Sequence, residues 1–538
     1  MTSVAESLAI TVVGQCASDG LFAGPCHSLS QLTASREHTG NPAAEAADLQ
    51  NAIAKAIAET TALMAASDTD AADILGFQLA LLEDDALVAP CWHAIANHAS
   101  AHGAWAATLD AHIRDYQASD DAYFQARSAD LEDLRDHVLR LMTGEVAQQL
   151  PTGHVLVGEE ISPSQFLGHD WSEGGAIVLA RGSSTSHVAM LARARGIAMV
   201  VQVDRLPLNF NGRVQVDAEA AQVIFDPDAQ QRHGFALRLE EATNRKAIES
   251  QFLFAPAQCA DGTGIKLLIN IAGPDDIANL DPAMCDGVGL MRSEFLFRDG
   301  APLPDEETQF QAYRRVLQWA GDKPVTIRTL DIGGDKPIRG LTPEAESNPF
   351  LGLRGVRLTL ARPDVFQVQL RALARAAVFG NLSVMLPMVT IAEEISASAA
   401  LLAEVVAALN AEGVACKAPP LGIMVEVPAA AIAPELFTAA AFFSIGSNDL
   451  AQYVTAASRD GGAVSSLHDV PHPAVLKLIH NLVSFASQHS MPISICGDMA
   501  SDENHIPALL GCGLRSLSVA VSRVARIKHA LSKARCGN

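Results

Sequence analysis

The stretch GIMVEVPAAAIAPELFTAAAFFSIGSNDLAQY, residues 422–453, contains the unit that decides the fold of the larger part of this chain. Two short apolar runs, GIMVEV and AFFSIG, flank a segment of helical character, and polar residues follow each run. Apolar runs of this length, bounded by turn-forming and polar residues, are typical of buried strands. The stretch is therefore predicted to form a strand, a helix and a second, parallel strand.

The same pattern repeats through the last part of the chain. Apolar runs alternate with helical segments there, and the runs read KLLINI, GVGLM, VTIRTL, LSVMLPM, GIMVEV, AFFSIG, ISICG and SLSVA. Eight such units predict a (β/α)8 barrel of the TIM type over residues 256–538. Because the chemistry of such barrels takes place at the carboxyl ends of the strands, the residues at those ends are the first candidates for a site.

The first part of the chain has a different organisation. Residues 31–147 are rich in Ala, Leu, Glu and Asp with helical apolar spacing, which predicts a helical bundle. Strand-like runs lie on both sides of it: ITVVGQ before, and HVLVGEE, GGAIVLA, GIAMVVQV and GRVQVDAEAAQVIF after. We therefore expect one β/α domain, residues 1–30 and 148–226, with the helical domain inserted into it. The charged segment 227–255 is expected to be a linker helix.

Composition and charge limit the functional classes. A chain of 538 residues that is 49% hydrophobic and 18% charged is expected to form several packed domains. The net charge of -23 argues against nucleic acid and anionic membranes, and suits a basic protein partner. Nine cysteines without a CxxC pair, and no apolar segment long enough to span a bilayer, indicate a cytoplasmic protein. We expect no disulfide framework, structural zinc site, signal peptide or membrane insertion.

Polar and charged residues follow most of the predicted barrel strands. They are Asn270, Arg292, Arg328, Asp331, Glu426, Asn448, Asp449 and Cys496, with Arg459 shortly beyond. Any one of them alone would more often be an ordinary rim residue, but their convergence on one barrel mouth favours a site. Guanidinium groups bind phosphate bidentately, and the carboxylates of Glu426 and Asp449 suit Mg²⁺. A small phosphorylated carboxylic acid, such as phosphoenolpyruvate, would match such a pocket. The thiol of Cys496 could serve as an acid or a nucleophile, or be an inert buried group.

A second candidate lies in GSSTSHVAMLAR, residues 182–193. A small polar turn becomes a helix there, and the free N–H groups of a helix start attract anions. His187 would place an imidazole nucleophile at that point. Taken alone, the segment is more often only a helix cap, with Thr185 or Ser186 as the capping residue.

These features together resemble the enzyme I family of the bacterial phosphotransferase system, the phosphoenolpyruvate-protein phosphotransferases. The matching text extends through nearly the whole chain and includes ASDGLFAGP, LLEDDAL, GSSTSHVAMLAR, GVGLMRSEFLFRD, RTLDIGGDKP, NPFLGLRGVR, GIMVEVPAA, FFSIGSNDLAQY and CGDMASDE. The resemblance implies a phosphohistidine swivelling β/α domain, a helical domain that docks a carrier protein, and a barrel that binds phosphoenolpyruvate. It also implies a homodimer formed through the barrel.

The resemblance assigns a role to each candidate residue. His187 would accept the phosphoryl group of phosphoenolpyruvate and pass it to a histidine of a small phosphocarrier protein. The residues that bind phosphoenolpyruvate would be Arg292, Arg328, Asn448, Asp449 and Arg459. Glu426 and Asp449 would hold Mg²⁺, and Cys496 would protonate the methylene carbon of the departing enolpyruvate to give pyruvate. A hinge is expected in the linker, because His187 and the barrel belong to different domains.

The sequence also departs from the family. Gln78 stands where family members often have a histidine, which leaves the choice of carrier open. The chain stops soon after ARIKHALSKARCGN, where many relatives continue, and a shorter end would weaken or alter the dimer. Acidic residues in the helical part could complement a basic carrier or simply form a solvated face; they are Glu83, Asp84, Asp85, Asp120 and Asp121.

Two other functions remain as alternatives at this point. A dikinase or phosphoenolpyruvate synthase would share the phosphohistidine and barrel domains, but the first 150 or so residues contain no GxxxxGKS phosphate loop. A regulator that binds carrier proteins without turnover would not need the complete set of strand-end residues. Sugar import and the regulation of nitrogen or carbon use are both compatible with the sequence.

Overall fold

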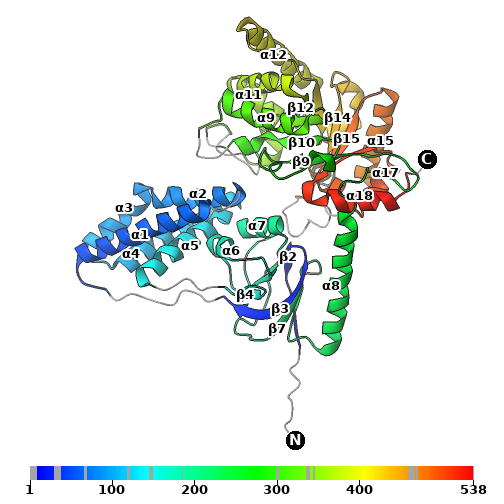
Figure 1. Ribbon diagram of the computed structural model, residues 1–538. Coiled ribbons are helices and arrows are strands. Elements are labelled where there is room, and N and C mark those ends of the chain that lie inside the picture. The colour runs from blue at the N-terminus through cyan, green and yellow to red at the C-terminus, as the bar shows by residue number, and fades with distance from the viewer. Residues whose placement is uncertain are drawn as a thin grey trace. The chain divides into compact units, whose positions relative to one another are not determined.

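The computed structural model divides into two compact units, Met1–Thr243 and Asn244–Asn538 (Figure 1). The structure describes residues 9–29, 38–65, 69–117, 122–144, 150–183, 186–297, 302–334, 338, 340–342, 346–458, 464, 467 and 471–536, without the side chains of 69–74 and 122–127. The two units meet in sequence within a single helix, α8 (Ala229–Ser250), inside the segment expected to be a linker. The finer domain boundaries stay predictions.

The described part of the first unit is built on an eight-stranded sheet with the order β1-β8-β7-β3-β4-β5-β6-β2. Its strands are β1 (Ile10–Val13), β2 (Gln15–Ser18), β3 (Leu21–Ser28), β4 (Val155–Gly158), β5 (Ala176–Leu179), β6 (Ala198–Val201), β7 (Arg213–Asp217) and β8 (Gln222–Phe225). Strands from both sides of the helical segment thus share one sheet. All the strand-like runs expected here are strands, whereas β2 and β3 were not expected. The parallel pairing of β3 with β4 and its antiparallel pairing with β7 join the two parts of the sheet.

The expected helical region lies between β3 and β4 in sequence. Its helices are α1 (Pro42–Ala65), α2 (Thr69–Leu82), α3 (Asp85–Ala96), α4 (Ala101–Gln117) and α5 (Ala122–Thr143). Their apolar faces surround Trp105, which is completely buried and whose indole N–H donates to the Arg135 carbonyl at 3.2 Å. A large aromatic side chain with its one polar atom satisfied gives this region a core of its own.

Two shorter helices connect the helical region to the sheet. They are α6 (Pro163–Gly168) and α7 (His187–Arg195), and one apolar cluster joins them to the sheet and to Leu75 of α2. Ser186 caps α7 by accepting a hydrogen bond from the Ala189 N–H, and Gly196 ends it in the left-handed conformation with φ of 66°. The first residue of α7 therefore lies beside the helical region.

The second unit confirms the expected barrel. Its strands close in the order β10-β11-β12-β13-β14-β15-β16-β9, with every neighbouring pair parallel. They are β9 (Lys266–Ile271), β10 (Val288–Arg292), β11 (Pro324–Arg328), β12 (Asn381–Leu386), β13 (Leu421–Val425), β14 (Phe443–Gly446), β15 (Ile493–Cys496) and β16 (Ser516–Ala520). Each of the eight predicted runs supplies one of these strands. All five residues of β13 are buried, as expected for a strand covered on both faces.

Helices cover the outside of the barrel strands (Figure 1). They are α9 (Glu306–Ala320), α10 (Val356–Ala361), α11 (Pro363–Ala376), α12 (Ala392–Ala411), α13 (Pro428–Ile432), α14 (Ser447–Thr455), α15 (Pro473–Gln488), α16 (Asp498–Ser501), α17 (Ile506–Gly511) and α18 (Val524–Lys533). None of the helices that the structure describes is both long and apolar enough to cross a membrane. The fold is thus a multidomain α/β architecture with a TIM-type barrel, as predicted.

Candidate functional site

A pocket opens at the carboxyl ends of the barrel strands, where the sequence predicts chemistry. Its described lining is Leu290, Arg292, Arg328, Asp331, Phe350, Arg354, Met424, Glu426, Gly446, Ser447, Asn448, Asp449, Cys496 and Gly497. The structure therefore brings together most of the predicted strand-end residues. Asn270 is not among them: its side chain donates to the Ser518 carbonyl and accepts from the Ser518 hydroxyl at 2.6 Å, so it ties β9 to β16. Arg459 lies outside the described residues.

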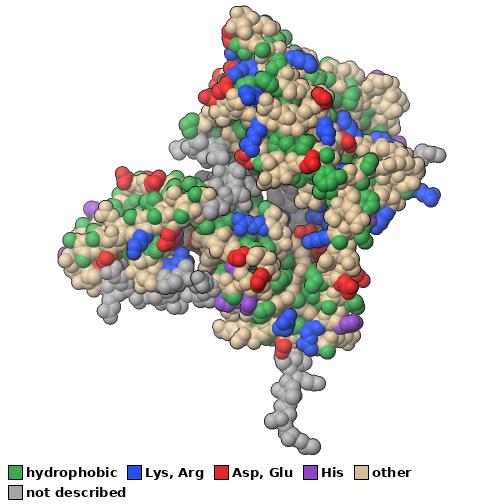
Figure 2. All heavy atoms as spheres, in the orientation of Figure 1, with side chains coloured by type: hydrophobic (Ala, Val, Ile, Leu, Met, Phe, Trp, Pro, Cys, Tyr) green, Lys and Arg blue, Asp and Glu red, His purple; other side chains and the backbone are tan. Residues whose placement is uncertain are grey.

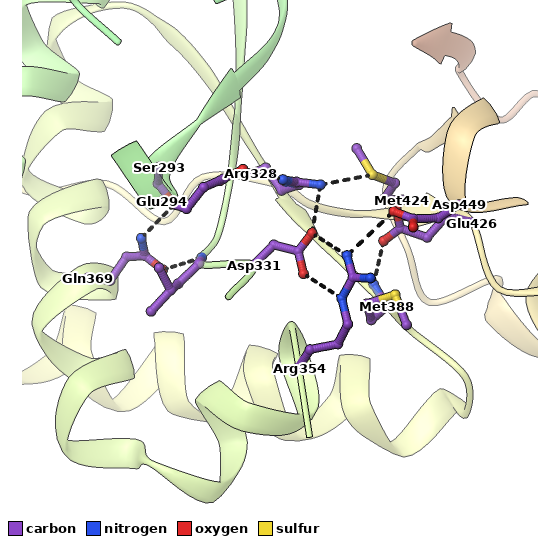
Figure 3. Close-up of polar contacts among 11 residues, drawn as sticks. Ser293, Glu294, Arg328, Asp331, Arg354, Gln369, Met388, Met424, Glu426 and Asp449 are labelled. Atoms are coloured by element: carbon purple, nitrogen blue, oxygen red, sulfur yellow. Dashed lines mark hydrogen bonds and ion pairs between the residues drawn. The ribbon is translucent and has the colours of Figure 1, made fainter. Parts of the chain in front are cut away.

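Arg328 ends β11 and is buried within the pocket wall. Its Nη2 donates to Glu294 Oε1 at 2.6 Å, and its Nη1 forms an ion pair with Asp331 Oδ2 at 2.9 Å (Figure 3). Burial alone would lower the pKa of Arg328, but the charges of the two carboxylates raise it, so the guanidinium stays charged. Its buried Nε has no hydrogen-bond partner among the described residues. That N–H is a donor available to an anionic ligand.

Arg354 is a pocket residue to which the sequence analysis assigned no role. It is buried, donates to both carboxylate oxygens of Asp331 at 3.3 and 3.1 Å, and reaches Asp449 Oδ2 at 3.5 Å (Figure 3). The next residue, Gly355, has φ of 61°, and a Cβ there would lie 2.8 Å from the Cβ of Met388. Because only glycine fits this close approach, the backbone can bring Arg354 over the pocket. The text NPFLGLRGVR was the only signal for it in the sequence.

Glu426 and Asp449 are the predicted metal ligands, and their surroundings fit a divalent cation. Glu426 is 1% exposed, and its Oε1 accepts a hydrogen bond from the Met388 N–H at 2.7 Å. Burial, followed by the charges of Asp449 and Asp331, raises the pKa of Glu426 well above its ordinary value. A Cβ on Gly446 would lie 2.9 Å from Glu426 Oε2, so glycine leaves room beside that oxygen. Mg²⁺ prefers hard carboxylate oxygens as ligands, and a bound cation would reduce the electrostatic repulsion between these two buried carboxylates.

Cys496 ends β15 and is 2% exposed. Its thiol lies 3.4 Å from the Ile445 carbonyl, and burial raises the pKa of the thiol to about 11. The group is therefore a neutral S–H at physiological pH, which suits a proton donor better than a nucleophile. Gly497 follows with φ of 97°, where a Cβ would lie 2.7 Å from Asn448 Oδ1. Glycine at this turn allows the thiol and the amide of Asn448 to line the same pocket.

His187 occupies the first position of α7, as predicted. Its Nδ1 lies 3.2 Å from the carboxylate of Asp130 on α5, and the imidazole is 16% exposed. A carboxylate oxygen can only accept, so Nδ1 carries the hydrogen and Nε2 is left as the basic nitrogen. The buried Asp130 was not predicted from the sequence. It orients His187 in the way that a carboxylate orients the histidine of a catalytic triad.

Gln78 contacts Asp133, which lies on the same face of α5 as Asp130. Asp133 Oδ2 accepts from the Gln78 Nε2 at 2.9 Å, and its Oδ1 accepts from the Ser164 hydroxyl at 2.7 Å. Gln78 is 2% exposed, so its amide is a link between α2 and α5. Its difference from the family's histidine therefore alters this internal contact rather than an exposed recognition surface.

The acidic candidates for carrier docking are partly described. Glu83, Asp84 and Asp85 are exposed at the junction of α2 and α3. Figure 2 shows several acidic side chains on the surface of the helical region. Asp84 also caps α3 by accepting from the Ala86 N–H at 2.8 Å. Asp120 and Asp121 lie outside the described residues.

Three family models match: "PEP-utilising enzyme, N-terminal" over residues 13–127, "PEP-utilising enzyme, mobile domain" over 150–221, and "PEP-utilising enzyme, PEP-binding domain" over 246–536. The chain belongs to the PEP-utilising enzyme family.

Curated relatives specify the branch of that family. A phosphoenolpyruvate-protein phosphotransferase of Geobacillus stearothermophilus is 34% identical, over 97% of this chain and 93% of the relative. Proteins of the same name from Cupriavidus necator and Haloferax volcanii are 35% and 40% identical, over 92% and 76% of this chain and 88% and 72% of theirs. The resemblance inferred from the motifs is therefore confirmed, and the relatives' names favour a phosphotransferase over a dikinase.

Proposed function

We propose that this enzyme moves the phosphoryl group of phosphoenolpyruvate to His187 and then to a histidine of a small phosphocarrier protein, releasing pyruvate. One observation carries the proposal: three arginines, three carboxylates and a neutral thiol line a single described pocket in the barrel. This set matches each part of a phosphorylated enol acid. It is the first step of a phosphotransferase system, and both sugar import and a regulatory pathway would be served by the same chemistry.

The arginines bind and orient the phosphate. Arg292 and Arg328 end neighbouring strands, and their Cα positions are paired in register. The unpaired Nε of Arg328 supplies a donor whose direction is already fixed by the ion pairs of its other nitrogens. In-line phosphoryl transfer needs this kind of positioning and charge neutralisation more than covalent help. Asn448 and Arg459 complete the proposed contacts to the substrate.

Glu426 and Asp449 are proposed to hold Mg²⁺, which when bound would neutralise charge on the phosphoryl and carboxylate oxygens of the substrate. The two carboxylates come from β13 and from the first turn of α14. Arg354 reaches Asp449 from the other side and thereby limits where that carboxylate can point. The protein's own contribution is a pair of carboxylates whose mutual repulsion the neighbouring arginines offset in part and a bound cation would offset further.

His187 attacks through Nε2 while Asp130 holds the hydrogen on Nδ1. The phosphorus–nitrogen bond forms as the bond from phosphorus to the enol oxygen breaks, and the imidazole ring gains positive charge that Asp130 stabilises. The enolpyruvate left behind takes a proton at its methylene carbon from the Cys496 thiol, and solvent returns that proton to the sulfur. Ketonisation to pyruvate then makes the step favourable.

The transfer requires His187 to reach the barrel and afterwards the carrier. We place the hinge of this movement in the predicted linker, residues 227–255, which is supported by the division of the chain within α8. The proposed carrier surface is the acidic α2–α3 junction, which would attract a basic partner over a distance.

A cytoplasmic homodimer formed through the barrel belongs to the same proposal. The nine cysteines are all free thiols, which suits a reducing compartment. Ile432 and Leu436 of the barrel unit are 69% and 61% exposed, and apolar side chains of this size favour burial in an interface. Light scattering should give twice the chain mass for the wild type and less for Leu436→Glu; a monomeric wild type would contradict the dimer.

The decisive experiment uses phosphate-labelled phosphoenolpyruvate with the purified protein and Mg²⁺. We expect acid-labile label on His187, and labelling should stop in chelator while label still arrives from a phosphorylated carrier. Cys496→Ala should slow pyruvate formation without removing His187 as acceptor. Labelling that requires ATP would establish a dikinase instead, and absence of any phosphohistidine would establish a carrier-binding regulator.

A further inference from the structure

A second cluster of ligand-type side chains lies in the barrel unit, away from the pocket. Among the described residues, one group of three has ligand atoms that all lie within 4.8 Å of one another: the Sγ atoms of Cys259 and Cys536 and a carboxylate oxygen of Asp261. Cys259 and Asp261 belong to a short hairpin closed by the bridge between Gln258 and Gly264, immediately before β9. The cluster therefore lies by the amino-terminal start of a strand, whereas the pocket lies at the carboxyl ends.

Hydrogen bonds fix this group before any ligand is present. Asp261 Oδ1 accepts from the Thr263 N–H at 3.0 Å, and its Oδ2 accepts from the Cys536 N–H at 3.0 Å. A backbone bond of 2.8 Å from the Ala260 N–H to the Ala534 carbonyl runs beside them. The segment that follows α18 is thus held against the hairpin, and the carboxylate of Asp261 is oriented by hydrogen bonds to Thr263 and Cys536.

The environment of the two sulfurs is also that of a ligand pair. Cys259 and Cys536 are 4% and 8% exposed, while Asp261 is exposed. Burial and then the neighbouring Cys536 thiol raise the pKa of Cys259, with Arg515 acting in the opposite direction. The two Sγ atoms lie within 4.8 Å of each other in this largely buried space, so a single cation could contact both.

We propose that Cys259, Cys536 and Asp261 form a binding site for a thiophilic divalent cation of the zinc class, with solvent reaching a fourth position beside Asp261. On binding, two S–H bonds break, two sulfur–metal bonds form, and two protons pass to the solvent, with no change of oxidation state. Paired thiolates select zinc-like cations over Mg²⁺, so this site is chemically separate from the pocket. The bound cation would fasten the last described residues of the chain to the start of the barrel.

The sequence contains no CxxC pair, and on that ground no structural zinc site is expected from it. Our proposal departs from that expectation, because the two cysteines come from opposite ends of the barrel region and are brought together by its closure. No spacing rule applies to ligands brought together in this way.

Cobalt(II) titration of the reduced full-length protein in excess Mg²⁺ tests the site, because thiolate–cobalt charge-transfer bands report sulfur coordination directly. We expect one equivalent to give these bands and zinc to abolish them. Cys259→Ser and Cys536→Ser should lose the bands, and Cys416→Ser, at a half-buried cysteine outside the cluster, should keep them. Asp261→Asn retains the turn to Thr263 and should weaken cobalt binding by at least about tenfold.

Three results would overturn the proposal: no thiolate bands in the wild type, bands that survive both serine variants, or conversion of the pair to a disulfide under the same conditions with cobalt left free. Zinc should also raise the thermal unfolding temperature of the wild type but not that of Cys536→Ser. Phosphotransfer from phosphoenolpyruvate should be retained in every folded variant. If both serine variants fail to fold, the Asp261→Asn titration decides, and unchanged cobalt affinity there rejects the site.

Discussion

The barrel pocket and the His187 site differ in how their functional side chains are held in place. In the pocket, Arg328 and Arg354 are both less than a tenth exposed and share the carboxylate of Asp331. His187 makes one described side-chain ion pair, with Asp130, and remains partly exposed at the start of a helix. The pocket holds its groups in place by mutual charge, whereas the histidine is oriented at Nδ1 by a single carboxylate of the described residues.

This difference reflects what each site has to bind. A pocket that receives one small anion gains from fixed dipoles and charges that need no rearrangement during the reaction. A histidine that meets first a small molecule and then a protein must keep its reactive nitrogen accessible. We therefore expect substitutions in the pocket to affect only the reaction with phosphoenolpyruvate, and substitutions around His187 to affect both transfers.

The largest effect is expected for His187→Ala. Removal of the nucleophile should lower labelling from both phosphoenolpyruvate and a phosphorylated carrier by more than about 10⁴-fold. Filter-bound radioactivity after denaturation under alkaline conditions measures this. His233→Ala, at an exposed histidine of α8, is the matched control and should be labelled like the wild type. Phosphate label on another residue of the His187→Ala variant would contradict the assignment of His187 as the phosphoryl acceptor.

The next largest effect is expected for Arg354→Met. It leaves Asp331 and Asp449 with one charge partner fewer, and we expect kcat/KM for phosphoenolpyruvate to fall by about 10²- to 10³-fold. Arg354→Lys keeps the charge without the planar fork and should recover only part of the loss. Charging of the variant by a phosphorylated carrier should be normal. If that reaction fell equally, the two sites would not be separable in the way described.

Asp130→Asn should have a smaller effect but on both transfers. Loss of the charged acceptor at Nδ1 removes a bond worth roughly 1.5–3 kcal/mol, so each rate should fall by about 10- to 100-fold. Single-turnover quench-flow with phosphoenolpyruvate and with a phosphorylated carrier measures the two rates. Asp133→Asn, one turn further along α5, keeps one of the two acceptor oxygens that contact Gln78 and Ser164 and should change stability more than rate. A decrease confined to the phosphoenolpyruvate reaction would contradict the role of Asp130.

Glu45→Gln should leave both transfers nearly unchanged and lower stability instead. Burial raises the pKa of Glu45, but hydrogen bonds from Thr39 and the Ala101 N–H outweigh it and lower the pKa to about 2. Since the folded value lies below the ordinary 4.5, this stabilisation is complete above 4.5 and is lost as the pH falls toward 2. Chemical denaturation should show the variant about 2 kcal/mol less stable at neutral pH.

The difference in the free energy of unfolding between Glu45→Gln and the wild type should disappear as the pH falls from 4.5 toward about 2. The exposed Glu404 of α12 supplies the control, because Glu404→Gln should change the free energy of unfolding little at any pH. A difference that stayed constant into acid would mean that the carboxylate of Glu45 is not the source of the stabilisation.

The barrel strands were predictable because each is an apolar run buried on both faces, and its end marks where chemistry lies. The rule failed for Asn270, whose partner Ser518 comes from the strand that closes the barrel. Closure brings together the first and last strands, and no local pattern reports it. The strand β3 was missed for a local reason, since Gly24 and Pro25 interrupt its apolar pattern.

The residues missed at the two sites share a cause. Arg354 follows a strand only after a long connection and enters the pocket because Gly355 allows the backbone to approach Met388. Asp130 sits in the middle of a helix, where an acidic residue is normally read as part of a solvated face. Both act through tertiary contacts between distant segments, which periodicity and strand-end rules do not encode.

The helix α8 has one residue buried over its whole described length, Phe235, and its Arg238 pairs with Asp217 near that anchor. Little of its sequence is constrained by packing, so substitutions at its exposed positions should change the free energy of unfolding little. The helix is thus the place where the chain could be cut and rejoined with least disturbance to the packing of either unit.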